Sequence, residues 1–71
     1  KRQPLMNVTV NGEEYTFADR PSLLDVLERL DLEPRGIAIA VNDELVTSEE
    51  WPNYLVRNDD KLLIVTASQG G

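Results

Sequence analysis

Hydrophobic residues alternate with polar ones over residues 6–10, which read Met-Asn-Val-Thr-Val. A period of two is typical of a strand with one buried face. Asn11-Gly12 follows directly, and this dipeptide is the strongest short signal of a hairpin because both residues tolerate positive φ. The alternation resumes over residues 15–18. We therefore predict a β-hairpin over residues 6–18.

The pattern then changes to helical spacing. Ser22 is a good N-cap, and Asp25 stands three residues later, as in a capping box. Pro34 disfavours helical backbone just before it, so we expect the helix to end near Leu30 or Asp31. The apolar residues of this segment fall on one helical face: Leu23, Val26, Leu27 and Leu30.

Three further strands are predicted in the second half of the chain. Large and small residues alternate over residues 37–41, and Asn42-Asp43 is a turn signal before a short strand at 44–46. Another turn signal, at 58–60, precedes the last strand, at 61–65. This strand is apolar on both faces, which favours a central place in the sheet.

The segment from Thr47 to Tyr54 has no regular pattern. Ser48 is suited to cap a single helical turn that would tuck Trp51 against the core. Pro52 is poorly placed for a longer helix because proline lacks the backbone N–H.

The order ββαβββ predicts an α+β fold, in which one mixed sheet carries one helix across one face. We expect the last strand to lie beside the first strand and parallel to it. Its outward side chains, Leu63 and Val65, would then form an apolar patch with Ala38 and Ala40, a candidate docking surface for a partner. The alternative is that residues 47–57, with Trp51 and Tyr54, cover this patch.

Composition removes several classes of function. The chain has no Cys and no His, which excludes a disulfide, a Cys or His zinc site, a cysteine nucleophile and a histidine base. Its net charge is −6 and its cations are scattered, which argues against nucleic-acid binding. No apolar run has the length of a membrane span. We expect a cytoplasmic protein that binds neither nucleic acid nor membrane and holds no metal.

The last residues, Ser68, Gln69, Gly70 and Gly71, are small or uncharged. Glycines without Cβ let such a segment enter a narrow slot, where the α-carboxylate of Gly71 could be activated by ATP as an acyl adenylate. We expect residues 66–71 to be a flexible tail on a domain of residues 6–65. Residues 1–5 lack the pattern of the domain, and we expect a tag remnant or a disordered extension there.

The chain resembles the ubiquitin-like β-grasp sulfur carriers, and among them the thiamine-biosynthesis carriers (ThiS). The resemblance covers nearly everything from Met6 onward, although Asp59 stands where the family often has Gly. Its most specific parts are the Ala-Val-Asn element at 40–42 and the Gln-Gly-Gly ending. The other matching elements are Asn11-Gly12-Glu13, the Leu23-Leu24 helix, Pro34 to Ile39, Trp51, and Asp60 to Val65.

The resemblance implies a carrier that is not itself an enzyme, has no catalytic residues and binds no cofactor. Gly71 would be adenylated by an E1-like enzyme with ATP and Mg. A sulfur donor system would convert the adenylate to a thiocarboxylate, which would donate sulfur to thiazole synthase. Gly70, Gln69 and Ser68 would form the tail that enters these partners.

Other functions remain open at this level. The small subunit of molybdopterin synthase would use the same carboxylate chemistry, and so would a ubiquitin-like modifier. A non-covalent β-grasp interaction module would not need Gly-Gly at its end. An enzyme is disfavoured, because acidic pairs such as Glu49-Glu50 lie in polar, turn-rich segments and are typical of solvated surface.

Overall fold

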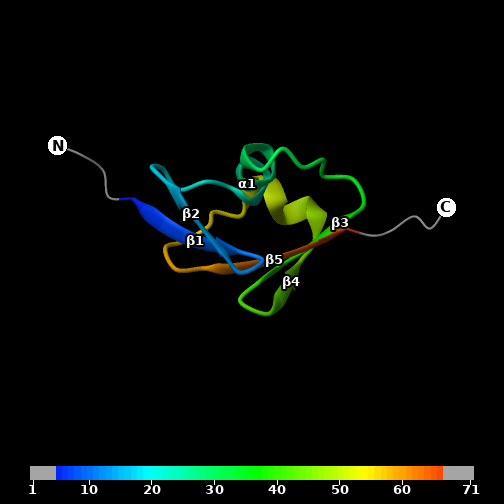
Figure 1. Cartoon of the computed structure of the whole chain (residues 1–71). Coiled ribbons are helices and arrows are strands. Elements are labelled where there is room, and N and C mark those ends of the chain that lie inside the picture. Colours follow the sequence, from blue (N-terminus) through cyan, green and yellow to red (C-terminus); the bar gives the residue numbers. More distant parts are fainter. Residues whose placement is uncertain (1–4, 67–71) are drawn as a thin grey trace.

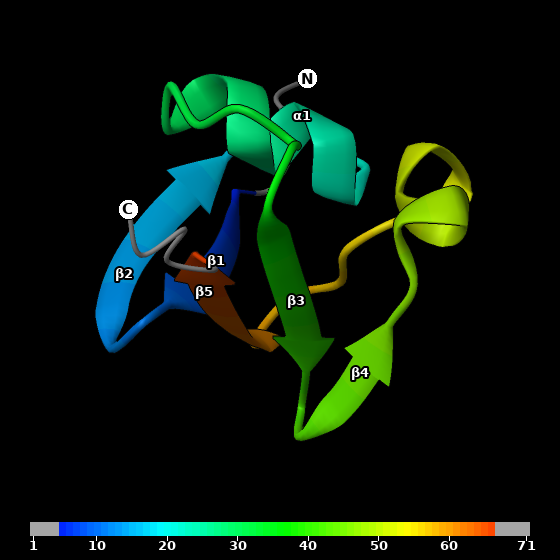
Figure 2. The same cartoon turned by 90° about the vertical axis from the view of Figure 1, so that its right-hand side faces the viewer.

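Five strands form one mixed sheet, and a single α-helix crosses one of its faces (Figures 1 and 2). The computed structural model describes residues 5–66. The strand order is β2-β1-β5-β3-β4, with β1 and β5 parallel and the other pairs antiparallel. The elements are β1 (Met6–Val10), β2 (Glu13–Phe17), α1 (Leu23–Arg29), β3 (Ile37–Val41), β4 (Glu44–Val46), the 3₁₀ helix η1 (Ser48–Asn53) and β5 (Lys61–Thr66).

This architecture confirms the predicted fold class and the central, parallel placement of the last strand. The central strand ends one residue later than expected, because Thr66 still pairs with Ile37 of β3. Residues 1–4 and 67–71 lie outside the described residues. Leu5 precedes β1 and is exposed. Within residues 5–66, no helix combines the length and apolar character needed to cross a bilayer.

Both predicted two-residue turns are present and have left-handed backbone. Asn11 and Gly12 have φ of 50° and 87°, and Asn42 and Asp43 have φ of 51° and 74°. Turns with positive φ at both central residues match the twist of the strands they connect. Asp59 also has left-handed backbone, with φ of 71°, at the position where the β-grasp sulfur carriers often have glycine.

The helix begins with the predicted capping box. The Ser22 hydroxyl accepts from the Asp25 amide at 3.1 Å, and the Asp25 carboxylate accepts from the Ser22 amide at 3.0 Å. At the other end Asp31 has φ of 61°, and the Leu32 amide donates to the Leu27 carbonyl at 2.9 Å. This is a Schellman ending in which Asp replaces the usual Gly. The C-cap is Leu30, which confirms the helix end predicted from the position of Pro34.

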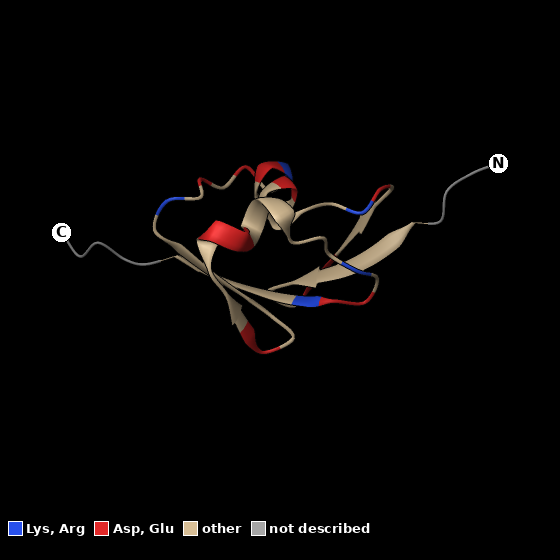
Figure 3. Cartoon of the chain, turned by 180° about the vertical axis from the view of Figure 1, so that it is seen from behind, with Lys and Arg blue, Asp and Glu red and all other residues tan. Residues whose placement is uncertain are grey.

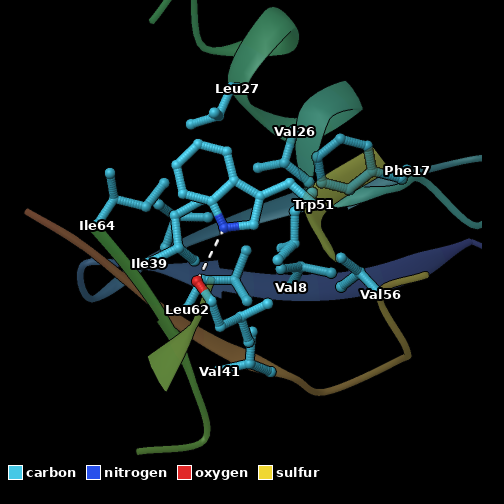
Figure 4. Close-up of a cluster of buried hydrophobic side chains, with 13 residues drawn as sticks. Val8, Phe17, Val26, Leu27, Ile39, Val41, Trp51, Val56, Leu62 and Ile64 are labelled. Atoms are coloured by element: carbon cyan, nitrogen blue, oxygen red, sulfur yellow. Dashed lines mark hydrogen bonds between the residues drawn. The ribbon is translucent and has the colours of Figure 1, made fainter. Parts of the chain in front are cut away.

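The core lies between α1 and the sheet, and Trp51 is at its centre (Figure 4). The Trp51 side chain is 2% exposed, and its indole N–H donates to the Val46 carbonyl at 3.0 Å. Its burial confirms the prediction that Trp51 packs against the core. The segment η1 is longer than the single turn expected and includes Pro52; its N-cap is Thr47, without a side-chain hydrogen bond, rather than Ser48. The buried residues that surround Trp51 are Val8, Phe17, Leu23, Val26, Leu27, Ile39, Leu62 and Ile64, with Val10, Val41, Val46 and Val56.

A candidate docking surface at the base of the C-terminal segment

The central strand β5 divides its side chains between the two faces of the sheet. Leu62 and Ile64 are buried under α1, whereas Leu63 and Val65 point to the open face and are 55% and 51% exposed. This alternation follows from the pleat of a strand. It places two large apolar side chains in solvent on the strand that leads to residues 67–71. The predicted tail residues Ser68, Gln69, Gly70 and Gly71 lie outside the described residues.

The neighbouring strand β3 presents small residues beside this pair. Ala40 is directly opposite Leu63, and Ala38 is directly opposite Val65. Alanine side chains are too short to cover their cross-strand neighbours. The structure therefore brings together all four residues that the sequence predicted for the patch. Residues 47–57 do not bury the patch, since Leu63 and Val65 stay about half exposed and Trp51 lies inside the core on the helix side of the sheet.

The structure adds Leu45 to this surface, which the sequence reasoning missed. Leu45 is opposite Ala40 on the other side from Leu63 and is 72% exposed, more than the other large hydrophobic residues of the described chain. The alternation of β4 could have indicated this position, because Val46 is buried and its neighbour Leu45 must therefore face outward. We call Ala38, Ala40, Leu45, Leu63 and Val65 the open-face patch.

The other half of the open face is polar. Thr9 pairs with Lys61 on one side and Glu14 on the other, and Asn7 pairs with Thr16. Outward positions of β1, β2 and the start of β5 thus carry hydroxyl, amide, carboxylate and ammonium groups. The apolar surface is thus confined to the half of the sheet formed by β3, β4 and the end of β5. An apolar region with a polar border is typical of a protein–protein contact surface.

Charge is unevenly placed around this surface. A shallow depression at its edge is lined by Arg35, Gly36, Ala38, Ser48 and Val65, with Pro34 and Ile37. Arg35 therefore lies at the rim of the open-face patch, close to the end of β5. Acidic residues lie on α1, η1, β2 and β4 and in the turns after β3 and before β5 (Figure 3).

Residues 5–66 contain no group of three or more His, Cys, Asp or Glu side chains placed to hold a metal ion. The chemical groups gathered by the described residues are those of a binding surface: exposed leucine and valine, small alanines, and a cation at the rim.

Comparisons with known proteins agree with this geometry. The ThiS family model matches residues 8–71. The sulfur carrier protein ThiS of Escherichia coli is 29% identical over 66 residues, which are 93% of this chain and 100% of that protein. A thiazole synthase of Paramagnetospirillum magneticum is 32% identical over 66 residues, 93% of this chain but only 20% of that protein.

The fold comparison gives the same result. A crystal structure of the thiamine biosynthesis protein ThiS from Geobacter metallireducens superposes with a TM-score of 0.79 at 25% identity, and the match covers 93% of this chain and all of that one. The chain therefore belongs to the ThiS family, the sulfur carrier proteins of thiamine biosynthesis.

Proposed function

We propose that the α-carboxylate of Gly71 is the group on which this carrier holds sulfur. A carboxylate is a poor electrophile because its leaving group would be oxide. Attack of this carboxylate on the α-phosphate of ATP forms an acyl adenylate and releases pyrophosphate. A sulfur nucleophile then displaces AMP and leaves a thiocarboxylate. The family match that extends through residue 71 supports this assignment.

The proposed activation is performed by an E1-like partner that supplies the ATP and Mg site, with a sulfur donor system as the source of sulfur. Phosphoryl chemistry requires positioned cations and metal, as in other ATP-dependent enzymes. The carrier contributes the carboxylate and a surface by which the partner holds it. Gly70, Gln69 and Ser68 form the narrow segment that enters the active site, since glycine needs little room.

The proposed acceptor of the sulfur is thiazole synthase. This is supported by the thiazole synthase that contains a stretch similar to this chain within one polypeptide. Covalent linkage of two sequences raises their effective concentration, which favours proteins that act in succession. No comparable observation favours a molybdopterin-pathway acceptor.

The open-face patch is the proposed docking surface for these partners. The observation that carries this is the placement of Leu63 and Val65 on β5, the strand that continues into the C-terminal segment. Gly71 is six positions after Val65, and an extended chain covers at most about 3.3–3.6 Å per residue. A partner that binds the patch can therefore hold its active site up to roughly 20 Å from Val65.

The experiment that tests the proposal is an intact-mass measurement after incubation with Mg-ATP, an E1-like activating enzyme and a sulfur source. We expect a gain that equals replacement of one oxygen by sulfur, located on Gly71 by fragmentation. Deletion of Gly71, and separately the addition of one alanine after it, should abolish the gain while the circular dichroism spectrum stays unchanged. An unmodified wild-type chain beside an active control carrier would refute the proposal.

A further inference from the structure

The pairing between β1 and β5 is continued by a side chain. The main-chain ladder ends where the Asn11 amide donates to the Leu62 carbonyl at 2.9 Å. Beyond that point the side chain of Asn11 takes over: its Oδ1 accepts from the Ile64 amide at 2.8 Å, and its Nδ2 donates to the Ile64 carbonyl at 3.1 Å. The carboxamide thus satisfies both backbone groups of a residue that is 53 positions away in sequence.

A second asparagine makes the corresponding contact at the opposite end of β5. Asn42 is the first residue of the turn after β3, as Asn11 is the first residue of the turn after β1. Its Oδ1 accepts from the Lys61 amide at 3.0 Å, and its Nδ2 donates to the Asp60 carboxylate at 3.0 Å. Both strands that flank β5 (Figure 2) therefore end in an asparagine bound to it, Asn42 at its start and Asn11 near its end.

We propose that Asn11 is a positioning residue for sulfur loading, which holds the end of β5 in the sheet and so sets the place from which the chain continues toward Gly71. Ile64 is only two residues before Thr66, the last residue of β5. The inference deepens the proposed function and rests on it, because a position for the segment matters only if a partner must receive Gly71. Asn42 binds Lys61 and Asp60, at the start of β5, so its loss would not release the end of the strand and it has no such role.

The physical basis is the number of residues that must be ordered when the partner binds. Without the Asn11 carboxamide, β5 beyond Leu62 keeps its pairing with β3, at Ala40, Ile39, Ala38 and Ile37, but loses its bonds on the β1 side. Local opening at the end of β5 then adds to the residues that the partner must order. Re-ordering even one backbone residue on docking lowers affinity by about tenfold. The loss falls on binding and leaves the chemistry on the bound carboxylate unchanged.

The test compares Asn11→Gly with Asn42→Gly in the full chain. Both asparagines have φ near 50°, which glycine adopts freely, so each variant removes the carboxamide without straining the turn. The measurements are KM and kcat for thiocarboxylate formation with the E1-like enzyme, and amide hydrogen exchange at Lys61 and Ile64. We expect Asn11→Gly to raise KM about tenfold with kcat unchanged and to speed exchange at Ile64. Asn42→Gly should speed exchange at Lys61 and leave KM unchanged.

Equal KM for Asn11→Gly and wild type, or equal increases in the two glycine variants, would overturn the inference. If Asn11→Gly does not fold, Asn11→Asp replaces it: a carboxylate still accepts from the Ile64 amide but cannot donate to the Ile64 carbonyl, and KM should rise in the same direction. A wild-type chain that is never loaded with sulfur refutes the proposed function instead. In that case, unchanged exchange at Ile64 in Asn11→Gly would also overturn the positioning role.

Discussion

Val65 lies directly opposite Ala38 across the antiparallel pair of β5 and β3, and about half of the Val65 side chain is exposed. The same relationship holds between Leu63 and Ala40. Because each large residue of β5 stands beside a small residue of β3, Leu63 and Val65 form a raised apolar ridge within the open-face patch. This ridge runs toward the C-terminal segment, which is why we assign it to partner docking.

Replacing either ridge residue with aspartate should weaken binding of the E1-like partner while the fold persists. For Leu63→Asp or Val65→Asp we expect a rise in Kd of about tenfold or more, as for a central interface residue. The free energy of unfolding should fall by less than about 1 kcal/mol, since both side chains face water. Titration calorimetry and urea unfolding measure the two quantities.

The matched control for these variants is Leu62→Asp, one residue earlier on the buried side of the same strand. Leu62 is 3% exposed, so an unpaired carboxylate there should cost several kcal/mol and unfold this small domain. A large stability loss in Leu63→Asp would place that residue in the core. Undiminished binding in both ridge variants would mean that the partner docks elsewhere.

The indole hydrogen bond of Trp51 should contribute measurably to stability. Trp51→Phe keeps an aromatic ring but removes the hydrogen bond from the indole N–H to the Val46 carbonyl, and the loss of one such bond costs about 0.5–1.5 kcal/mol. Trp51→Ala should cost about 3–5 kcal/mol because it also opens a cavity. Thermal and urea unfolding measure both. Tyr54→Phe, at a half-buried ring, serves as the comparison and should change stability by no more than about 0.5 kcal/mol.

The capping box at the start of α1 should behave as a local stabiliser. Ser22→Ala removes the acceptor of the Asp25 amide, and loss of an N-cap costs about 1 kcal/mol. Thr47→Ala is the matched control, because Thr47 is the N-cap of η1 but makes no side-chain cap bond. Its stability should be nearly unchanged in urea unfolding. Equal losses in both variants would mean that the Ser22 hydroxyl adds nothing specific.

Association with the activating partner should slow as salt is added. The chain has a net charge of −6, and long-range attraction between opposite charges is screened when the Debye length falls from about 10 Å at 0.1 M salt to about 3 Å at 1 M. Stopped-flow measurements over this range should show the on-rate falling by about tenfold or more. The variant Glu49→Gln/Glu50→Gln should show a shallower salt dependence. An on-rate independent of salt would assign the charge to solubility alone.

Much of the fold was predictable because its signals are local. The two turns with positive φ, the capping box and the period-two strands each depend on residues within a few positions of one another. The four predicted patch residues were also found, since the pleat of β5 and the small residues of β3 determine which side chains face outward. Leu45 was missed although it follows the same rule, because its three-residue strand gave too short a pattern to weigh.

Two features escaped prediction, one at the end of α1 and one in η1. Asp31 was expected only near the helix end, and its left-handed backbone is stable because Leu32 reaches back to Leu27. The 3₁₀ geometry of η1 through Pro52 likewise follows from the burial of Trp51, which fixes the segment against the core.

By itself, the amino-acid sequence determined the elements, their order and which face of each strand is apolar, because these follow from backbone preference and side-chain period. Only the tertiary structure decided what each polar side chain meets. Asn11 was recognisable as a turn residue, but its carboxamide binds Ile64 because the parallel pairing of β1 with β5 places the end of β1 beside that residue. A hydrogen bond between residues so far apart in the chain depends on the whole fold being formed, and no local pattern encodes it.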